Sequence, residues 1–266
     1  MLSNIVFQSP NETAFSLFGF DVYYYGIILA LAIFIGYLVA YSLYKKYYDP
    51  EKAKYITEIS PYLILIGIVG ARLYYCCVNF SYYIYHPIEI FYIRQGGLSI
   101  HGMIIAGIIG LYIFSRKYKM KFSQLADTFL CGSILAQSIG RWGNFFNSEA
   151  FGLPTSLPWK LYIPPSHRPI EYINFEYFHP TFLYESILDF LIFLILLICF
   201  KKLSKNSGTT ACVCLILYSL ARIFVEAYRI DSVLSIKGYP IAQIVSVLTI
   251  FLSSLLLIKI TCFKIK

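Results

Sequence analysis

Seven long runs of apolar residues constrain this chain more than any other feature of its sequence. A helix needs about 20 apolar residues to cross the hydrocarbon core of a bilayer. Runs of that kind lie at approximately residues 19–44, 58–78, 98–115, 125–145, 181–200, 209–228 and 239–258. A membrane β-barrel would instead show alternating segments of about ten residues. With 58% hydrophobic and 14% charged residues, the sequence predicts an all-α integral membrane protein with seven transmembrane helices.

Basic residues are unevenly distributed between the predicted loops, and loops rich in lysine and arginine stay in the cytoplasm. The loops after the first, third and fifth runs and the carboxyl-terminal tail hold Lys45, Lys46, Lys52, Lys54, Arg116, Lys117, Lys119, Lys121, Lys201, Lys202, Lys205, Lys259, Lys264 and Lys266. The opposite loops hold only Arg94, Lys160, Arg168, Arg229 and Lys237. We therefore expect the amino terminus outside and the carboxyl terminus in the cytoplasm. The net charge of +8 follows from this topology and does not require a nucleic-acid partner.

The longest stretch between the predicted helices covers residues 148–180 and is rich in proline. It is too short to build an independent core, and it lies on the predicted outer side. We therefore expect a single seven-helix transmembrane domain over residues 1–266, with 148–180 as a small extracytoplasmic cap.

The cysteines and histidines do not predict a metal or a cofactor. All seven cysteines lie within or beside apolar runs, and their spacing indicates neither a disulfide framework nor a metal site. None of the four histidines belongs to an HExxH pattern, and the glycine-rich segment GGLSIHG lacks the lysine of a P-loop. We therefore expect no metal and no cofactor.

Three arginines, Arg72, Arg141 and Arg222, lie inside predicted spans. Each costs about 2.5–3.5 kcal/mol at a helix centre, so such residues usually serve a function or pair with other groups. A single arginine near an interface could simply extend to the headgroups, and Arg222 with Glu226 could be only a structural ion pair. However, all three occupy the outer part of their helices, which predicts a similar depth near the outer headgroups.

Other polar side chains are predicted at this depth. Tyr25 and His101 lie near the outer ends of the first and third runs. Tyr218, Arg222 and Glu226 are four residues apart, so they share one helix face. Because lipid tails cannot solvate these groups, we expect them to surround a polar cavity. Guanidinium groups with tyrosine, histidine and amide donors suit a phosphate, and the phosphates at this depth belong to phospholipids.

The segment GRWGNFFNSEAFG, residues 140–152, resembles the signature G-R-x-G-N-F-x-N-x-E-x-x-G of bacterial prolipoprotein diacylglyceryl transferases. GGLSIHG, HPTFLYE and ARIFVEAYR resemble other segments of the family in the same order. Two departures are Met103, where the family usually has glycine, and Phe182, which is often glutamine. The first could narrow the space beside His101.

The resemblance implies a reaction at the bacterial cytoplasmic membrane. The diacylglyceryl group of phosphatidylglycerol moves to the lipobox cysteine thiol of a preprolipoprotein, a thioether forms, and glycerol phosphate leaves. This is the first step of bacterial lipoprotein maturation. The partners implied are phosphatidylglycerol, the lipobox segment and membrane lipid, and we expect the protein to act as a monomer.

The family's essential residues correspond to Tyr25, His101, Arg141, Asn144, Glu149, Gly152, Tyr218, Arg222 and Glu226. Arg141 and Arg222 are expected to bind the phosphate and stabilise the leaving group. Tyr25, Asn144 and Tyr218 are expected to orient the headgroup. Glu149 and Glu226 are expected to hold the arginines, and Gly152 to permit a close turn beneath the cap. His101 is either the base that removes the thiol proton or a hydrogen-bond donor to phosphate, and the sequence leaves both roles open.

A transporter or flippase for an anionic solute is the main rival interpretation. It predicts polar residues along a path to the cytoplasmic side and often repeat symmetry. Here the charges concentrate at the outer ends, and the cytoplasmic halves of the runs are nearly all apolar. A seven-helix receptor is less favoured still, because the last run lacks a mid-span lysine for a retinal.

Overall fold

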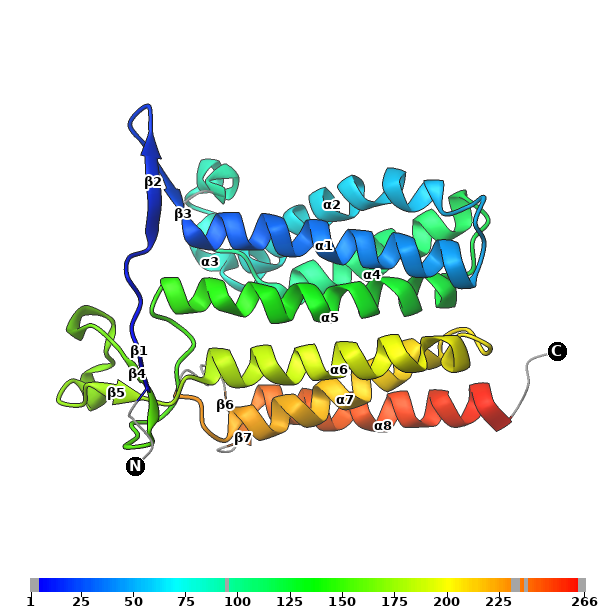
Figure 1. Ribbon diagram of the computed structural model, residues 1–266. Coiled ribbons are helices and arrows are strands. Elements are labelled where there is room, and N and C mark those ends of the chain that lie inside the picture. Colours follow the sequence, from blue (N-terminus) through cyan, green and yellow to red (C-terminus); the bar gives the residue numbers. More distant parts are fainter. Residues whose placement is uncertain (1–4, 94–95, 231–234, 237–238, 263–266) are drawn as a thin grey trace. The chain divides into compact units, whose positions relative to one another are not determined.

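The computed structural model describes residues 5–93, 96–230, 235–236 and 239–262 (Figure 1). This part of the chain is mostly helical. Its long helices are α1 (Tyr24–Tyr47), α2 (Lys54–Val78), α4 (Ile100–Lys117), α5 (Phe122–Phe146), α6 (Thr181–Leu203), α7 (Thr209–Glu226) and α8 (Ile241–Cys262). The chain divides into two compact units, one comprising Met1–Val39 and Phe129–Lys266 and the other Ala40–Thr128. The prediction of a single domain over the whole chain stays a prediction.

Each predicted apolar run coincides with one of the long helices. Within the described ranges, six helices are long and apolar enough to cross a membrane: α1, α2, α4, α6, α7 and α8. The fourth run is the helix α5, which carries polar residues such as Gln124, Asp127 and Gln137 and is not among the six. A multi-pass membrane protein is therefore supported, whereas a seven-helix topology remains a proposal.

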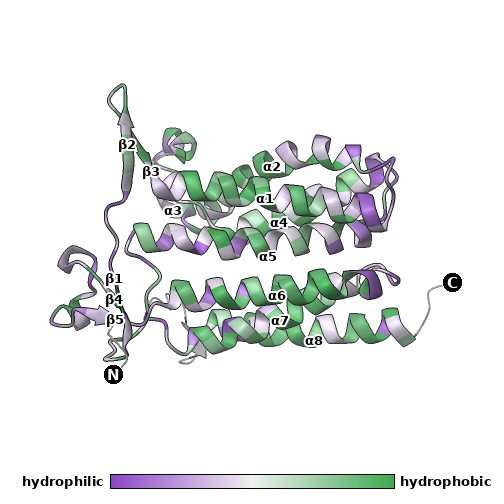
Figure 2. Ribbon diagram, viewed as in Figure 1, coloured by the Kyte–Doolittle hydropathy of each residue, from purple (hydrophilic) through white to green (hydrophobic). Residues whose placement is uncertain are grey.

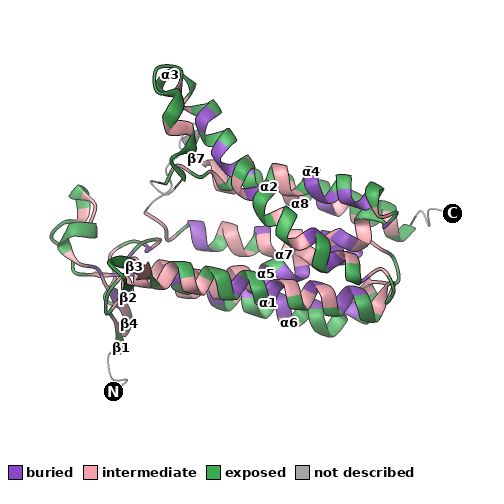
Figure 3. Cartoon of the chain, turned by 90° about the horizontal axis from the view of Figure 1, so that it is seen from above, coloured by how far each residue is buried: buried purple, intermediate pink, exposed green. Residues whose placement is uncertain are grey.

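The helices present apolar side chains on their exposed faces. Hydrophobic residues follow the helices, and hydrophilic residues gather in the turns (Figure 2). Exposed residues alternate with buried ones along the helices (Figure 3). On α4, Ile104, Ile105, Ile108 and Ile109 are each at least 50% exposed. Such continuous apolar surfaces are rare in water-soluble proteins and suit contact with lipid tails.

The first apolar run was predicted to begin a helix at residue 19, and this start is wrong. Residues Phe20–Tyr23 form strand β3, which pairs antiparallel with β2 (Thr13–Leu17). The turn between them consists of Phe18 and Gly19, which have φ values of 50° and 82°. Two positive φ angles give a hairpin turn whose twist matches that of the paired strands. The helix α1 therefore begins only at Tyr24.

The predicted cap segment forms, together with β1, a small three-stranded sheet in the first unit. Strand β4 (Trp159–Tyr162) pairs in parallel with β1 (Ile5–Phe7) and antiparallel with β5 (Tyr177–Phe178), and two short 3-10 helices connect β4 to β5. The buried residues Phe151, Leu161, Ile163, Phe178 and Phe182 form its hydrophobic core. Because Phe182 belongs to the first turn of α6, this core fixes the segment to that end of the helix. Its extracytoplasmic location stays a prediction.

In the second unit, α2 and α4 pack closely through small residues. A Cβ atom on Gly102 would overlap the carbonyl oxygen of Gly70, and a Cβ atom on Gly70 would overlap Ala106. The backbone N–H of Ser99 donates to the carbonyl oxygen of Ala71 at 3.1 Å, which ties the start of α4 to α2. Small residues at helix contacts are typical of membrane proteins, because close backbone approach replaces the hydrophobic driving force.

Arg72 binds the loop between α2 and α4 within this second unit. Its guanidinium donates to the carbonyl oxygens of Glu89, Ile90, Gly96 and Gly97 at distances of 2.5–3.0 Å. The group also lies over the rings of Tyr75 and Tyr83. Only 6% of the residue is exposed. Arg72 therefore closes the loop between α2 and α4, and its donors are used within that loop.

Two of the basic loops lie at one end of the second unit. The Nζ atom of Lys52, in the turn between α1 and α2, donates to the carbonyl oxygen of Lys119, between α4 and α5, at 3.0 Å. Two lysine-rich turns at one end agree with a common side of the membrane. Four other basic residues used for the orientation, Arg94, Lys237, Lys264 and Lys266, lie outside the described residues.

Candidate functional site

The first unit contains a cluster of three arginines around one carboxylate. Glu185, in the second turn of α6, pairs with Arg141 of α5, with Arg222 of α7 at 2.8 Å, and with Arg229 just beyond α7 at 2.7 Å. Arg222 also pairs with Glu226 at 2.8 Å, one turn along α7. The Glu185 side chain is 5% exposed. Arg141, Arg222 and Glu226, which the sequence grouped by depth and helix face, therefore do meet.

The packing of α5 against α6 explains why Arg141 reaches Glu185. The Ser138 hydroxyl donates to the carbonyl oxygen of Ser186 at 2.7 Å, and the Ser186 hydroxyl donates to that of Ser138 at 2.8 Å. Serine is small enough to let two helix backbones approach, and its hydroxyl satisfies a second carbonyl acceptor. Arg141 lies three residues after Ser138, and Glu185 is adjacent to Ser186. The reciprocal serine contact therefore aligns the ion pair.

Among the ion pairs of the described residues, the three guanidinium groups share the carboxylates of Glu185 and Glu226. The Nε atom of Arg141 is buried and has no hydrogen-bond partner among the residues that the structure describes. A buried guanidinium donor without a partner favours an additional acceptor, such as an anion. In the described ranges, no group of three or more histidine, cysteine or acidic side chains could hold a metal ion. The arrangement is suited to an anionic ligand.

Asp189 is a further buried carboxyl group near the cluster. It lies one turn after Glu185 on the same face of α6 and is 2% exposed. It is close enough to Gln137, Arg141 and Arg222 for their charges or dipoles to act on it. However, Asp189 makes no direct ion pair with an arginine among the described residues. It therefore belongs to the surroundings of the cluster rather than to its direct contacts.

Glu149 contacts amides rather than an arginine. Its Oε1 atom accepts hydrogen bonds from Asn144 Nδ2 at 2.8 Å and from Asn147 Nδ2 at 3.4 Å. Positive φ angles of 53° at Ser148 and 55° at Ala150 turn the chain back after α5, which brings the carboxylate to Asn144. The described ion pairs therefore differ from the prediction that Glu149 holds an arginine, and Glu185 has that contact instead.

Gly152 lies where three segments of backbone meet. Its N–H donates to the carbonyl oxygen of His179 at 2.9 Å, and the next residue, Leu153, donates to that of Tyr228 at 2.8 Å. A Cβ atom at Gly152 would overlap the Tyr228 carbonyl oxygen and lie 2.8 Å from Thr181 Cγ2. Glycine is therefore required by close approach. Since Tyr228 precedes Arg229, this contact also fixes one arginine of the cluster.

Gly152→Ala is expected to lower the free energy of unfolding by about 1–3 kcal/mol, because an added methyl group overpacks a site bounded by backbone. The thermal midpoint in detergent measures the effect. Gly140→Ala is the matched control, since a Cβ atom there would meet nothing within 4 Å. Equal thermal midpoints for the two variants would contradict this explanation.

The remaining predicted residues lie at different distances from the cluster. Tyr25, in the first turn of α1, is close enough for the charges of Glu149 and Arg141 to act on its hydroxyl. Tyr218 lies one turn before Arg222 on α7 and is half-buried. His101 lies in the first turn of α4, in the second unit, where it is exposed and its ring centroid is 6.0 Å from that of Tyr74. That His101 faces the arginines therefore stays a prediction.

Sequence reasoning missed two members of the cluster. The sequence assigned no role to Glu185, and it counted Arg229 only as a loop residue. Two signals could have identified them. A carboxylate in an otherwise apolar helix needs a partner, and Arg229 follows Arg222 by seven residues, a spacing that would continue the same face if the helix were extended.

The two departures from the family's segments have identifiable surroundings. Phe182 is fully buried and packs against Trp142 and Phe145, with ring centroids 5.6 and 5.3 Å apart. It therefore extends an aromatic core beneath the cap segment. The Cγ atom of Met103 lies 3.3 Å from where a Cβ atom of Gly67 would be, so Met103 packs against α2.

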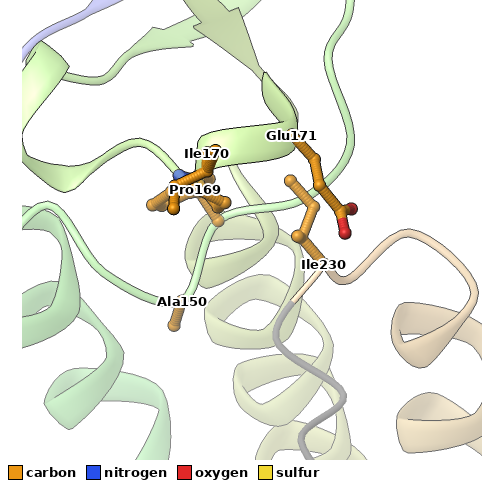
Figure 4. Close-up of a pocket in the computed structure, with 6 residues that line it drawn as sticks. Ala150, Pro169, Ile170, Glu171 and Ile230 are labelled. Atoms are coloured by element: carbon orange, nitrogen blue, oxygen red, sulfur yellow. The ribbon is translucent and has the colours of Figure 1, made fainter. Parts of the chain in front are cut away.

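A pocket of about 390 Å³ lies next to the end of the signature segment. Its lining residues are Ala150, Phe151, Pro169, Ile170, Glu171 and Ile230. Figure 4 shows Pro169, Ile170 and Glu171 of the cap segment above Ala150. Among the described residues of the lining, Glu171 is the only charged one, so this pocket differs in chemistry from the arginine cluster.

Comparison with known proteins agrees with the residue patterns. The family model described as "Prolipoprotein diacylglyceryl transferase" matches residues 12–259. Three similar proteins, each named phosphatidylglycerol–prolipoprotein diacylglyceryl transferase, come from Synechocystis sp., Thermosynechococcus vestitus and Acaryochloris marina. They are 43%, 44% and 44% identical over 93%, 93% and 92% of this chain, and the matches cover 88%, 91% and 89% of the relatives.

Proposed function

The chain belongs to the prolipoprotein diacylglyceryl transferase family, and we propose that its arginine cluster binds the phospholipid phosphate in the reaction of that family. The enzyme transfers the diacylglyceryl group of phosphatidylglycerol to the cysteine thiol of a prolipoprotein. The observation that carries the assignment is the buried Nε of Arg141, which has no hydrogen-bond partner among the described residues and belongs to a cluster of three arginines. The phosphodiester of phosphatidylglycerol supplies a negative charge and oxygen acceptors for this donor.

The reaction requires a sulfur nucleophile and a stabilised leaving group. The substrate thiol loses its proton. The thiolate then attacks the carbon of the diacylglyceryl group that is bonded to a phosphate oxygen. A carbon–sulfur bond forms while the carbon–oxygen bond breaks, and glycerol phosphate leaves with an additional negative charge. Cations placed at that phosphate stabilise the transition state more than the ground state. Arg141, whose Nε donor has no hydrogen-bond partner among the described residues, is the residue best placed to stabilise the new charge.

The other site residues support this role. Glu185 and Glu226 hold the arginine side chains, since each makes ion pairs of 2.8 Å with Arg222. Glu149 holds the amide of Asn144, which is then directed toward the headgroup together with Tyr25 and Tyr218. The attacking thiol comes from the prolipoprotein, so none of the enzyme's cysteines is needed for catalysis.

The membrane arrangement is part of the proposal. We propose seven transmembrane helices, with α5 as the fourth, the amino terminus outside, residues 148–180 as an extracytoplasmic cap, and a monomer in the bacterial cytoplasmic membrane. The polar face of α5 is acceptable in a bilayer because Arg141 pairs with Glu185 on α6. Cysteine labelling of the loops from each side of intact cells tests the orientation. Labelling of the loop after α1 from outside would contradict it.

Incubation of the purified protein with phosphatidylglycerol and a lipobox peptide tests the function. We expect a diacylglyceryl adduct on the peptide cysteine, detected by mass spectrometry, and release of glycerol phosphate. A peptide with serine in place of the cysteine is the control and should remain unmodified. Movement of the lipid or of an anionic solute across the membrane without any adduct would support a transporter instead.

His101→Gln separates the two roles proposed for this histidine. Glutamine retains a hydrogen-bond donor but cannot accept a proton at neutral pH. If His101 is the base, the variant is expected to lose about a hundredfold or more of the transfer rate and the acidic limb of the pH–rate profile. If the variant keeps more than about a tenth of the rate with the same acidic limb, His101 is not the base.

A further inference from the structure

Gly143 of α5 lies directly against the ring of Tyr25. A Cβ atom added at Gly143 would lie 2.5 Å from Tyr25 Cδ2, 3.0 Å from Cε2 and 3.2 Å from Cγ. Real Cβ atoms do not approach other heavy atoms to 2.5 Å, so the ring and a side chain at position 143 cannot share this space. Gly140, one turn earlier on the same helix, has no neighbour within 4 Å of an added Cβ atom. The two glycines of the signature are therefore not equivalent.

The chain on either side of Tyr25 is held against the end of α5. The adjacent Tyr24 stacks on Phe146 at the end of α5, with ring centroids 4.3 Å apart and an interplanar angle of 19°. The Ser9 hydroxyl donates to the carbonyl oxygen of Phe146 at 2.9 Å, so the segment before α1 is held by the same turn of α5. The first turn of α1 thus has little freedom to move away from Gly143.

This contact connects Tyr25 with the arginine cluster. Arg141 lies two residues before Gly143 on α5, and the charges of Arg141 and Glu149 both act on the Tyr25 hydroxyl. We propose that Gly143 is a positioning residue for diacylglyceryl transfer, whose missing side chain allows the Tyr25 ring to lie on α5 and keeps its hydroxyl within electrostatic reach of Arg141. The inference rests on the proposed function, and it assigns to Gly143 an action through Tyr25 alone.

A methyl group at position 143 must displace the ring by about 1 Å to restore ordinary contact distances. A misplacement of about 1 Å at a catalytic site can reduce the rate about a hundredfold. We therefore expect Gly143→Ala to reduce kcat/KM by about ten- to hundredfold. Gly140→Ala should stay within about threefold of the wild type, because its added methyl group meets open space.

A double-mutant cycle with Tyr25→Phe tests whether Gly143 acts through the tyrosine hydroxyl. Once the hydroxyl is absent, its contribution to the transfer rate is already lost, so displacing the ring should reduce the rate little further. Gly143→Ala should therefore reduce transfer by less than about threefold in the Tyr25→Phe background. A full ten- to hundredfold reduction in that background, or normal transfer by Gly143→Ala alone, would overturn the proposal.

The thermal midpoint tests the contact independently of activity. Gly143→Ala should lower the midpoint of the wild type, but not that of a Tyr25→Ala variant, because removing the ring removes the clash. An equal decrease in both backgrounds would show that Tyr25 is not the group displaced, and would overturn the inference. If the wild type forms no adduct at all, the proposed function fails, and the positioning role fails with it. If the wild type forms the adduct and the Gly143 variants form it at the same rate, only the positioning role fails.

Discussion

Replacing Arg141 or Arg222 with alanine is expected to reduce diacylglyceryl transfer at least a hundredfold, while the protein still inserts in the membrane. Each arginine is proposed to donate to the phosphate as glycerol phosphate leaves, and removal of one such donor typically costs about 10²–10³ in rate. Arg141 should affect kcat most, since its buried Nε is free of protein partners in the described residues and can serve the developing charge. Initial rates with phosphatidylglycerol and a lipobox peptide, at matched protein amounts, measure both effects.

Lysine should restore little of this activity. The planar guanidinium of Arg222 donates to Glu185 and Glu226 with two different nitrogens, which a single ammonium group cannot reproduce. Arg116→Ala is the control for loss of a positive charge, because Arg116 is exposed at the end of α4. Near-normal turnover by both alanine variants would contradict the assignment of the cluster as the phosphate site.

Glu185→Gln is expected to have the second large effect. The carboxylate pairs with three arginines, and its replacement by a neutral amide leaves their charges facing one another. Breaking a buried ion pair by removing one partner costs about 3–5 kcal/mol, which corresponds to at least about a hundredfold when it is expressed in function. We expect both a lower thermal midpoint and a loss of transfer, because the arginines can no longer be held in one geometry.

Asp189→Asn provides a matched comparison on the same face of α6. Asp189 is also buried, but it makes no direct ion pair with an arginine in the described part of the chain. Its variant should therefore lose clearly less activity than Glu185→Gln. If the two variants are equally impaired, burial of a carboxylate rather than its direct contact with the arginines determines the effect.

Features that depend on short stretches of sequence could be predicted correctly. Each apolar run coincides with a long helix, because an apolar segment of this length forms its backbone hydrogen bonds internally whatever its neighbours are. The start of α1 was misplaced, because Phe20 and Val22 are as apolar as a helix would require. Only the positive φ angles at Phe18 and Gly19 show that these residues belong to a hairpin.

The candidate site was predicted in part. Helix periodicity placed Arg222 beside Glu226, and the structure has this ion pair. Periodicity cannot tell which carboxylate meets Arg141, because the partner lies on another helix. Glu149, only eight residues away in sequence, turns back to Asn144, whereas Glu185 reaches Arg141 from α6.

The sequence by itself therefore determined the class of the protein, its family signature and the residue types of the site. These properties reside in local composition, in spacing along one helix and in a continuous segment. The tertiary structure decided which charges meet, through the close contact of Ser138 with Ser186 and of Gly152 with Tyr228. Such contacts join segments far apart in the chain, and they depend on how closely two backbones can approach.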